Sequence, residues 1–330
     1  MKERWQQIIF SVVLGLMLPG LILRMGLLLR QAKNIQLPPA QQSVSTAPST
    51  TQSDKPPKTI PVLLKDGALS QLELEVYLVG VVLAEMPASF EEEALKAQAV
   101  VARTYAMKRI SEGQRHPQGA ICTDSTCCQA YISVSEYLET MGNARDVEKI
   151  TQAVTDTQDL VLTYDGSFAE ATYFSCSGGR TEDAAAVWGE AIPYLQAVDS
   201  PGEEGAAPYR EVVSFSPEEF AAALGRSLSG SPKSWLGPVT YTQGGGVATM
   251  VVAGISYTGV RLRQLLGLNS TAFTMEISEG SIRITTQGKG HRVGMSQYGA
   301  DAMAVTGSDY AAILSHYYPG TKIDKLDAIG

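Results

Sequence analysis

Glu85 is the first residue in the chain whose type and position suit chemistry. Its carboxyl group continues an apolar stripe of residues at helical spacing, formed by Leu74, Leu78, Val81 and Val82. Burial in such a stripe disfavours the charged form, so we expect the pKa of Glu85 to be raised. A carboxyl group of that kind suits general acid catalysis. The competing interpretation is a helix-terminal charge paired with Lys96 or Arg103.

A second group of reactive side chains is a regular series of potential metal ligands. His116, Cys122 and Cys128 lie six residues apart in a loop-like stretch. One imidazole and two thiolates could hold a tetrahedral zinc ion, with Cys127, a water or a carboxylate as the fourth ligand. A disulfide from Cys122 to Cys127 or Cys128 and free thiols are equally open interpretations.

Polar residues also gather in the stretch 172–181, which leaves a predicted strand and enters a Gly-Gly turn. Such a turn can present backbone N–H groups and hydroxyl groups to a ligand, although most are simply turns. Cys176 could act as a nucleophile with His291, but a cysteine that leaves a strand is more often packed than reactive.

The stretch 288–304 places closely spaced glycines around His291, Ser296 and Gln297. It lacks the Gly-Lys-Ser/Thr ending of a phosphate-binding loop. The glycines allow sharp turns or the close approach of a ligand, and the competing interpretation is a plain connection from a strand to a helix.

The elements that must position these residues indicate an α+β fold, with helices and short antiparallel strands around a central catalytic helix. That helix is predicted over 90–110, starting with a capping box of Ser89 and Glu92. Glycine turns predict hairpins at 60–72 and 160–173. Further elements are a helix at 147–157, short strands at 249–252, 272–277 and 281–286, and a helix at 297–305.

The N-terminal part of the chain has a different composition. Residues 8–29 are apolar and long enough for one transmembrane helix, and no signal-peptidase-like site follows them directly. We therefore expect a cytoplasmic segment at 1–7, a membrane anchor at 8–29, a flexible linker at 30–59 and a folded ectodomain at 60–330. The flanking charges do not fix the orientation of the anchor.

Overall composition excludes some classes of protein. The chain has 330 residues, of which 44% are hydrophobic and 18% charged, so it can bury a substantial core and is not wholly disordered. Its net charge of -8 and the absence of a basic run argue against nucleic-acid binding.

Long ordered blocks of the sequence resemble the stage II sporulation protein D family of lytic transglycosylases. The blocks are YLVGVVLAEMPASFEEEALKAQAVVARTYA, ICTDSTCCQAY, TYFSCSGGRTEDAAAVWGEAIPYLQAV, VRLRQLLGLNSTAF, GHRVGMSQYGADAMA and ILSHYYPGT. The resemblance implies peptidoglycan remodelling during forespore engulfment, by an enzyme anchored in the mother-cell membrane with its ectodomain outside the cytoplasm. It also implies a partner cell-wall amidase and a membrane scaffold protein.

The resemblance further implies roles for individual residues. Glu85, in the E-M-P motif, is the expected catalytic residue. His116, Cys122 and Cys128 are the expected ligands of one structural zinc ion, with Cys127 spare. Residues of the matched blocks are expected to bind the glycan strand: Lys96, Arg103, Tyr173, Ser175, Ser177, His291, Ser296 and Gln297.

Two positions depart from the family pattern. Arg292 replaces the second glycine of the common GHGVG, and Cys176 replaces the threonine of the usual S-T-S-G-G.

A lytic transglycosylase needs only one carboxyl group, because the same glutamate can protonate the leaving oxygen and then activate the 6-hydroxyl of the sugar. A muramidase would need a second acid such as Glu91, Glu170 or Glu182. The sequence is also compatible with a non-catalytic glycan-binding scaffold and, more weakly, with a zinc-dependent amidase.

Overall fold

The computed structural model describes residues 58–113 and 115–329. The predicted anchor at 8–29 and almost all of the predicted linker at 30–59 lie outside the described residues. Within the described ranges, no helix combines the length and the apolar character needed to cross a membrane.

The first described elements form the predicted hairpin. Strands β1 (Thr59–Leu63) and β2 (Leu69–Glu73) pair in antiparallel fashion, and β3 (Ile121–Cys122) adds to β1 in parallel. The hairpin leads directly into helix α2 (Leu74–Glu85), of whose 12 residues eight are buried. The hairpin therefore fixes the start of the helix that ends at Glu85.

The predicted central helix is present as α3 (Glu92–Glu112), which starts and ends two residues later than the predicted 90–110. The predicted capping box at Ser89 is wrong, because no side chain caps the first turn. Instead, the Glu91 N–H group donates a 2.7 Å hydrogen bond to Asp301, far along the chain. A tertiary contact thus satisfies this backbone donor in place of a local cap.

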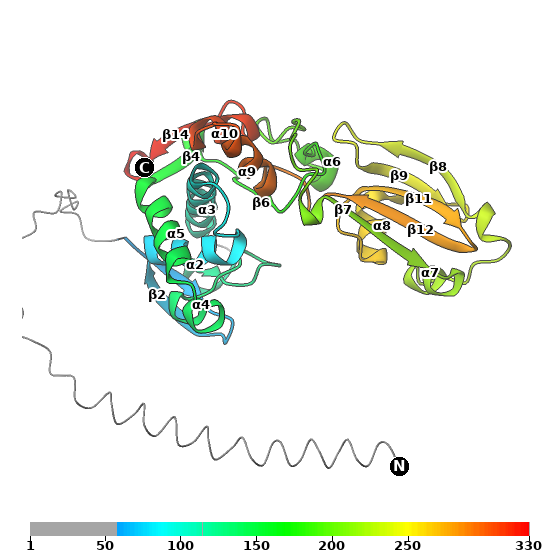
Figure 1. Cartoon of the computed structure of the whole chain (residues 1–330), viewed down its shortest axis with the longest axis horizontal. Coiled ribbons are helices and arrows are strands. Elements are labelled where there is room, and N and C mark those ends of the chain that lie inside the picture. The colour runs from blue at the N-terminus through cyan, green and yellow to red at the C-terminus, as the bar shows by residue number, and fades with distance from the viewer. Residues whose placement is uncertain (1–57, 114, 330) are drawn as a thin grey trace, which may run out of the picture. The chain divides into compact units, whose positions relative to one another are not determined.

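Small side chains let other elements pack closely against α3 on several sides. Its alanines at 94, 97, 102 and 106 are completely buried, which allows close packing of neighbouring backbones. Figure 1 shows α3 among the helices of this part of the molecule. The elements that pack against it are α2, α5 (Ala144–Asp156), α9 (Gln297–Val305), α10 (Tyr310–Tyr317) and β4 (Leu160–Tyr164).

Two more sheets complete the first hydrophobic core. Strand β4 pairs with β5 (Ser167–Phe168) in the second predicted hairpin and with β14 (Lys322–Lys325) on its other edge. Strands β6 (Tyr173–Phe174) and β13 (Met295–Ser296) pair in parallel. This short pairing brings the polar stretches 172–181 and 288–304 side by side, although they are over 100 residues apart in the sequence.

A second core lies in the region between these two stretches. One antiparallel sheet has the order β11-β12-β7 and another has the order β10-β9-β8. Phe220, Trp235 and Ile284 are among the residues buried between these sheets and their helices. The elements are β7 (Arg210–Phe215), α7 (Pro217–Ala223), β8 (Leu236–Tyr241), β9 (Val247–Val252), β10 (Ile255–Thr258), α8 (Gly259–Leu266), β11 (Ala272–Ser278) and β12 (Ser281–Gln287).

The α+β class predicted from the sequence is confirmed, with differences in detail. The predicted helix at 147–157 begins earlier, as α5, because Asn143 caps it by accepting a hydrogen bond from the Arg145 N–H group. Helix α4 was not predicted. The remaining short elements are α4 (Val134–Met141), α6 (Ala184–Trp188) and the 3-10 turns Pro117–Gly119, Ala207–Tyr209, Pro232–Ser234 and Leu326–Ala328.

Candidate active site

A cavity of about 750 Å³ brings together several of the residues that the sequence singled out. Its walls come from the end of α2, from α3, from the loop after His116, and from the paired stretches around β6 and β13. The predicted site residues that line it are Glu85, Cys128, Tyr173, Ser175, His291 and Gln297. The end of α6 and the segment after it also contribute Trp188, Glu190 and Ile192, so residues from six separate parts of the sequence meet in one place.

Glu85 is half-buried at the C-terminal end of α2, in the cavity wall. Its Oε1 atom accepts a 2.8 Å hydrogen bond from the Ala130 N–H group and a 3.2 Å hydrogen bond from the Tyr173 hydroxyl group. Burial raises the pKa of Glu85 above its ordinary value of 4.5, while these donors and the nearby Gln297 amide oppose the rise. The predicted direction of the shift is confirmed.

The sequence pattern around Glu85 explains its burial. Leu78, Val81 and Val82, which share its helical stripe, are all completely buried. The helix stops at Glu85, and Pro87 follows within two residues, as is common after a helix end. The carboxyl group is thus placed where an apolar helix face meets the cavity.

A short network of hydrogen bonds holds Tyr173 beside Glu85. The Tyr77 hydroxyl group donates to Gln129 Oε1 over 3.2 Å, and Gln129 Nε2 donates to the Tyr173 oxygen over 3.1 Å. Gln129 is almost completely buried, so its amide orientation is fixed by these partners. Sequence reasoning missed Gln129 and Ala130, and their only signal was their place directly after the cysteine pair.

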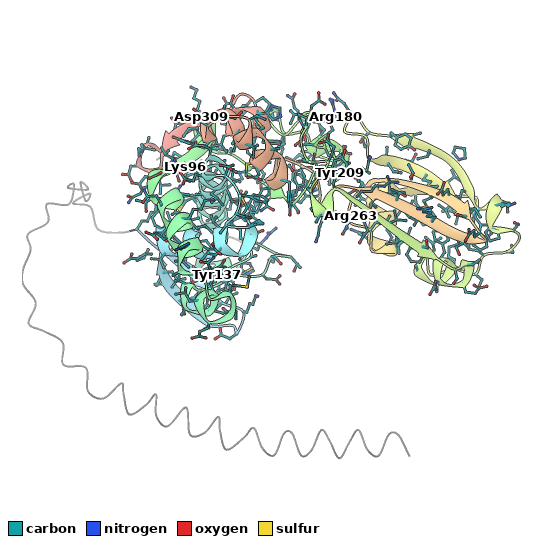
Figure 2. All side chains as sticks on the ribbon, in the orientation of Figure 1. Lys96, Tyr137, Arg180, Tyr209, Arg263 and Asp309 are labelled. Carbon is teal, nitrogen blue, oxygen red and sulfur yellow. The ribbon has the colours of Figure 1, made fainter. Side chains whose placement is uncertain are left out.

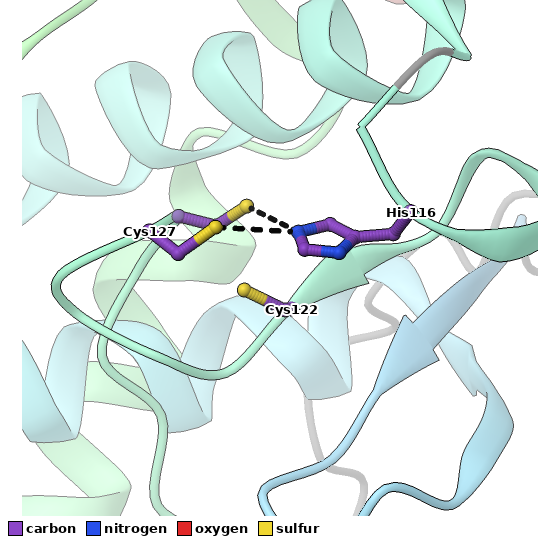
Figure 3. Close-up of side chains that lie close together, drawn as sticks. His116, Cys122 and Cys127 are labelled. Atoms are coloured by element: carbon purple, nitrogen blue, oxygen red, sulfur yellow. Dashed lines mark hydrogen bonds between the residues drawn. The ribbon is translucent and has the colours of Figure 1, made fainter.

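The potential metal ligands form a tight cluster. His116, Cys122, Cys127 and Cys128 place one ligand atom each within 4.8 Å of one another. His116 Nε2 lies 3.4 Å from the Cys127 sulfur and 3.5 Å from the Cys128 sulfur, as the dashed lines in Figure 3 mark. All four cysteines of the chain are free thiols in the structure, so none of the disulfides considered is formed.

The dimensions of this cluster suit a tetrahedral ion. Zinc–sulfur bonds of about 2.3 Å and zinc–nitrogen bonds of about 2.0 Å give sulfur–nitrogen edges of about 3.5 Å in a tetrahedron. The two measured edges, 3.4 Å and 3.5 Å, fit that value. The cluster could therefore hold a metal ion, and Cys127, left spare by the resemblance, lies within it.

Lys96 and Arg103 lie on α3 but do not line the cavity. Lys96 Nζ is 2.9 Å from Glu93 and 3.1 Å from Asp156, and Figure 2 shows Lys96 among the helices of the first core. Arg103 is completely buried, forms an ion pair with Glu75 and donates to two backbone carbonyl groups. These contacts join α3 to its neighbouring helices.

Ser177 and Ser296 also lie outside the cavity lining. Their hydroxyl groups donate to the buried carboxylate of Glu203, over 2.7 Å and 2.5 Å. The Cys176 thiol donates to the same carboxylate, and burial raises the pKa of Cys176 to about 12. A thiol of that kind is a poor nucleophile. The pairing of Cys176 with His291 therefore finds no support in the geometry.

His291 lies in the cavity wall between two aromatic rings, those of Phe174 and Trp188. Its Nδ1 atom accepts a 3.1 Å hydrogen bond from the Val293 N–H group. Burial and, to a smaller extent, the positive charge of Arg263 together lower the pKa of His291 to about 4. The imidazole is thus neutral at physiological pH.

The glycines of the stretch 288–304 permit the close approach of strands. Gly294 has a φ angle of 81°, and a Cβ atom there would lie 2.1 Å from the carbonyl oxygen of Thr172. Only glycine fits this position. Gly294 therefore serves the close packing of β6 against β13.

Arg292, which departs from the family pattern, is buried and has a φ angle of 67°. Its guanidinium group forms an ion pair with buried Glu182 and donates to the carbonyl oxygens of Ser177, Arg180 and Gly244. Gly244 precedes β9, so this side chain connects the cavity region to the second core. These bonds hold Arg292 in a backbone conformation that residues other than glycine rarely adopt.

The other carboxylates considered as catalytic partners are already engaged or distant. Glu170 lines the cavity but forms an ion pair with Arg109. Glu182 is buried against Arg292, and Glu91 precedes α3 outside the cavity lining. Glu85 differs from these three because it lines the cavity and accepts hydrogen bonds from neutral donors, and the exposed Glu190 lines the cavity as well.

Comparison with known proteins supports one family. The model of the SpoIID family, described as "Stage II sporulation protein", matches residues 65–164. Stage II sporulation protein D of Bacillus subtilis is 38% identical over 87% of this chain and 85% of its own length. The protein of that name from Bacillus amyloliquefaciens is 37% identical over 82% and 80%. The amidase enhancer of Bacillus subtilis is 29% identical over 74% of this chain and 40% of its own length. The matched region includes Glu85 and the His/Cys cluster, and the chain belongs to the stage II sporulation protein D family.

Proposed function

We propose that this chain is a lytic transglycosylase that cleaves peptidoglycan glycan strands during forespore engulfment in sporulation. The observation that carries the proposal is Glu85: a half-buried carboxyl group with a raised pKa, held at a cavity wall by two neutral donors. The names of the most similar relatives support a role in sporulation, and that of the amidase enhancer supports one at the cell wall.

The proposed reaction uses Glu85 twice. In its protonated form it gives a proton to the glycosidic oxygen, so that the leaving sugar departs as an alcohol. The carboxylate then takes the proton of the 6-hydroxyl group of the other sugar, which retains the anomeric carbon, and that oxygen closes a 1,6-anhydro ring on this carbon. The Ala130 and Tyr173 donors suit both steps, because they stabilise the carboxylate without removing the transferable proton.

A muramidase is the second candidate, since Glu170 lies in the same cavity. A hydrolase needs its second carboxylate free to activate water or attack the sugar. The ion pair of Glu170 with Arg109 occupies that carboxylate, whereas the exposed Glu190, which also lines the cavity, is the other acid that a hydrolase could use. The experiment below separates the two reactions by their products.

For the His/Cys cluster we propose one zinc ion with Cys127 as the fourth ligand, beside His116, Cys122 and Cys128. Three thiolates and one imidazole are typical of closed structural sites, which leave no open position for a water molecule. This argues against a zinc-dependent amidase. The segment directly after Cys128 supplies the Ala130 N–H group, so a bound ion would steady the donor that holds Glu85.

The cellular setting is part of the same proposal. Residues 8–29 would anchor the chain in the mother-cell membrane, with the ectodomain outside the cytoplasm, facing the space around the forespore. A partner amidase and a membrane scaffold protein would act with it. The relative named amidase enhancer is consistent with an amidase partner.

Product analysis tests the proposed reaction. Purified glycan strands are incubated with the full-length protein, and the fragments are measured by mass spectrometry. We expect ends lighter by one water than hydrolytic ends, because the 6-hydroxyl group replaces water as the nucleophile. Ends that are reducing, together with loss of activity in Glu170→Gln or Glu190→Gln, would establish a muramidase. Bound but uncleaved strands would establish a scaffold.

A further inference from the structure

Trp188 is a large apolar side chain left exposed in the wall of the cavity. It is the last residue of α6, and 44% of its surface is exposed. It lines the same cavity as Glu85. Tryptophan side chains are rarely this exposed to solvent unless they contact a partner. Exposed aromatic rings in concave sites commonly contact ligands.

The Trp188 ring is held in position by the residues behind it. Its centroid lies 5.6 Å from that of His291, with 55° between the ring planes, and His291 in turn packs edge-on against Phe174 at 5.6 Å. Asp183 caps the start of α6, and Gly189 ends it with a φ angle of 81°. Because these contacts fix the ring before any ligand arrives, binding costs little side-chain entropy.

The same cavity contains an amide group that acts on Glu85. Gln297 is 6% exposed and lines the cavity, and its side chain helps to lower the pKa of Glu85 against the effect of burial. The cavity therefore offers an aromatic face at Trp188 and, at Glu85, a carboxyl group that can donate a proton.

This set of groups matches an N-acetylated sugar. One face of a hexose ring consists of C–H groups that can lie on an aromatic ring, while its edges carry hydroxyl groups and its acetamide carries a carbonyl acceptor. We propose that Trp188 is the stacking platform of a subsite for one N-acetylhexosamine ring of the glycan strand. The subsite deepens the proposed glycan cleavage and rests on it.

Binding of an oligomer of N-acetylglucosamine tests the platform directly. Full-length Glu85→Gln, which should not cleave the ligand, is titrated with the tetramer of N-acetylglucosamine in a calorimeter. When Trp188→Ala is added to the Glu85→Gln variant, the Kd for the tetramer should rise about 10-fold, because roughly one ring face of apolar contact is lost. Trp188→Phe should restore most of the affinity. Tyr241→Ala is the matched control, because Tyr241 is an exposed aromatic residue on β8 that does not line the cavity.

Fluorescence and kinetics add independent readouts. The chain has three tryptophans, and Trp235 is buried in the second core, so tetramer-dependent quenching should disappear in Trp188→Phe. With glycan strands, Trp188→Ala should raise KM and leave kcat nearly unchanged, as expected for lost ground-state binding.

Each outcome decides the matter. A tetramer that does not bind the unsubstituted chain, or that binds Trp188→Ala as tightly as its parent, overturns the platform. A tetramer that binds through Trp188 while strands stay uncleaved supports the platform and overturns the proposed enzyme. The two failures are thus distinguishable.

Discussion

Two glutamates near the paired stretches β6 and β13 differ in how fully their oxygens are bonded. Glu203 is 1% exposed and accepts hydrogen bonds from two backbone N–H groups, three hydroxyl groups and one thiol. Glu85 is half-buried and accepts two hydrogen bonds, both on Oε1. The first carboxylate is saturated by protein donors, whereas the second is open to the cavity.

This difference separates a structural carboxylate from a chemical one. The donors that surround Glu203 occupy its oxygens and bind the loop 176–178 to Ser296. Glu85 keeps a raised pKa because burial outweighs its few donors. Burial by itself is therefore a weak guide to catalysis, and the number of protein partners is a better one.

The largest expected effect is on cleavage by Glu85→Gln. The amide keeps the shape of the side chain but cannot transfer a proton, so strand cleavage should fall by about 10²-fold or more. The free energy of unfolding should not decrease, because a carboxyl group with a raised pKa costs stability once pH exceeds its unfolded value. Cleavage assays and urea unfolding at pH 7 measure the two quantities. Wild-type cleavage by the variant would contradict the proposed role.

Glu203→Gln should show the opposite pattern. Replacing a carboxylate that satisfies six buried donors leaves several of them poorly paired, and we expect a loss of about 2–4 kcal/mol in the free energy of unfolding. Urea unfolding checks this, with the exposed neighbour substitution Glu204→Gln as the control. If Glu203→Gln proves as stable as the control, saturation by donors is not what distinguishes the two carboxylates.

Removal of the metal should affect the surroundings of Glu85 more than those of Glu203. Metal analysis should find about one zinc per chain, and Cys122→Ser and Cys127→Ser should both lower its content and the melting temperature. Cys176→Ser, a substitution of the buried thiol outside the cluster, should leave the zinc content unchanged.

Hydrogen exchange locates the effect of the metal. A chelator should speed exchange in peptides that contain Ala130, while peptides that cover 176–178 should respond less. An unchanged zinc content in Cys127→Ser would show that Cys127 is not a zinc ligand.

The smallest expected effect concerns the donor from Tyr173. Its hydroxyl group favours the charged form of Glu85, so Tyr173→Phe should raise the pKa of Glu85 further. The alkaline limb of kcat/KM, where the acid loses its proton, should move to higher pH by up to about one unit. Tyr105→Phe, a change in the same cavity, should leave the limb in place. A limb that moves to lower pH in Tyr173→Phe would contradict this hydrogen-bond role.

Local sequence signals predicted the elements of the first core well. The glycine turns at 66–67 and 165–166 gave the correct hairpins, because such turns depend on residues that are adjacent in the chain. Helix α3 was predicted to within two residues at each end. Its cap was missed because Asp301, which lies 210 residues away, accepts the Glu91 N–H bond.

The second core was less predictable. Strands β9, β11 and β12 were expected, whereas β7, β8 and β10 were not. Strand β8 exposes nearly all of its side chains, so it lacks the alternating apolar pattern that identifies a strand. Its pairing with β9 supplies the order that its own sequence does not specify.

The sequence by itself determined the position of Glu85 on an apolar helical stripe, the direction of its pKa shift and three members of the His/Cys cluster, whereas the structure added Cys127. These features follow from spacing along one helix or one loop, where neighbours in sequence are neighbours in space. Tertiary structure alone decided that Ala130 and Tyr173 hold Glu85, that Lys96 and Arg103 bind other helices, and that Ser177 and Ser296 serve Glu203. Those assignments depend on long-range contacts, such as the packing of α2 and α5 against α3 and the pairing of β6 with β13, which no local pattern encodes.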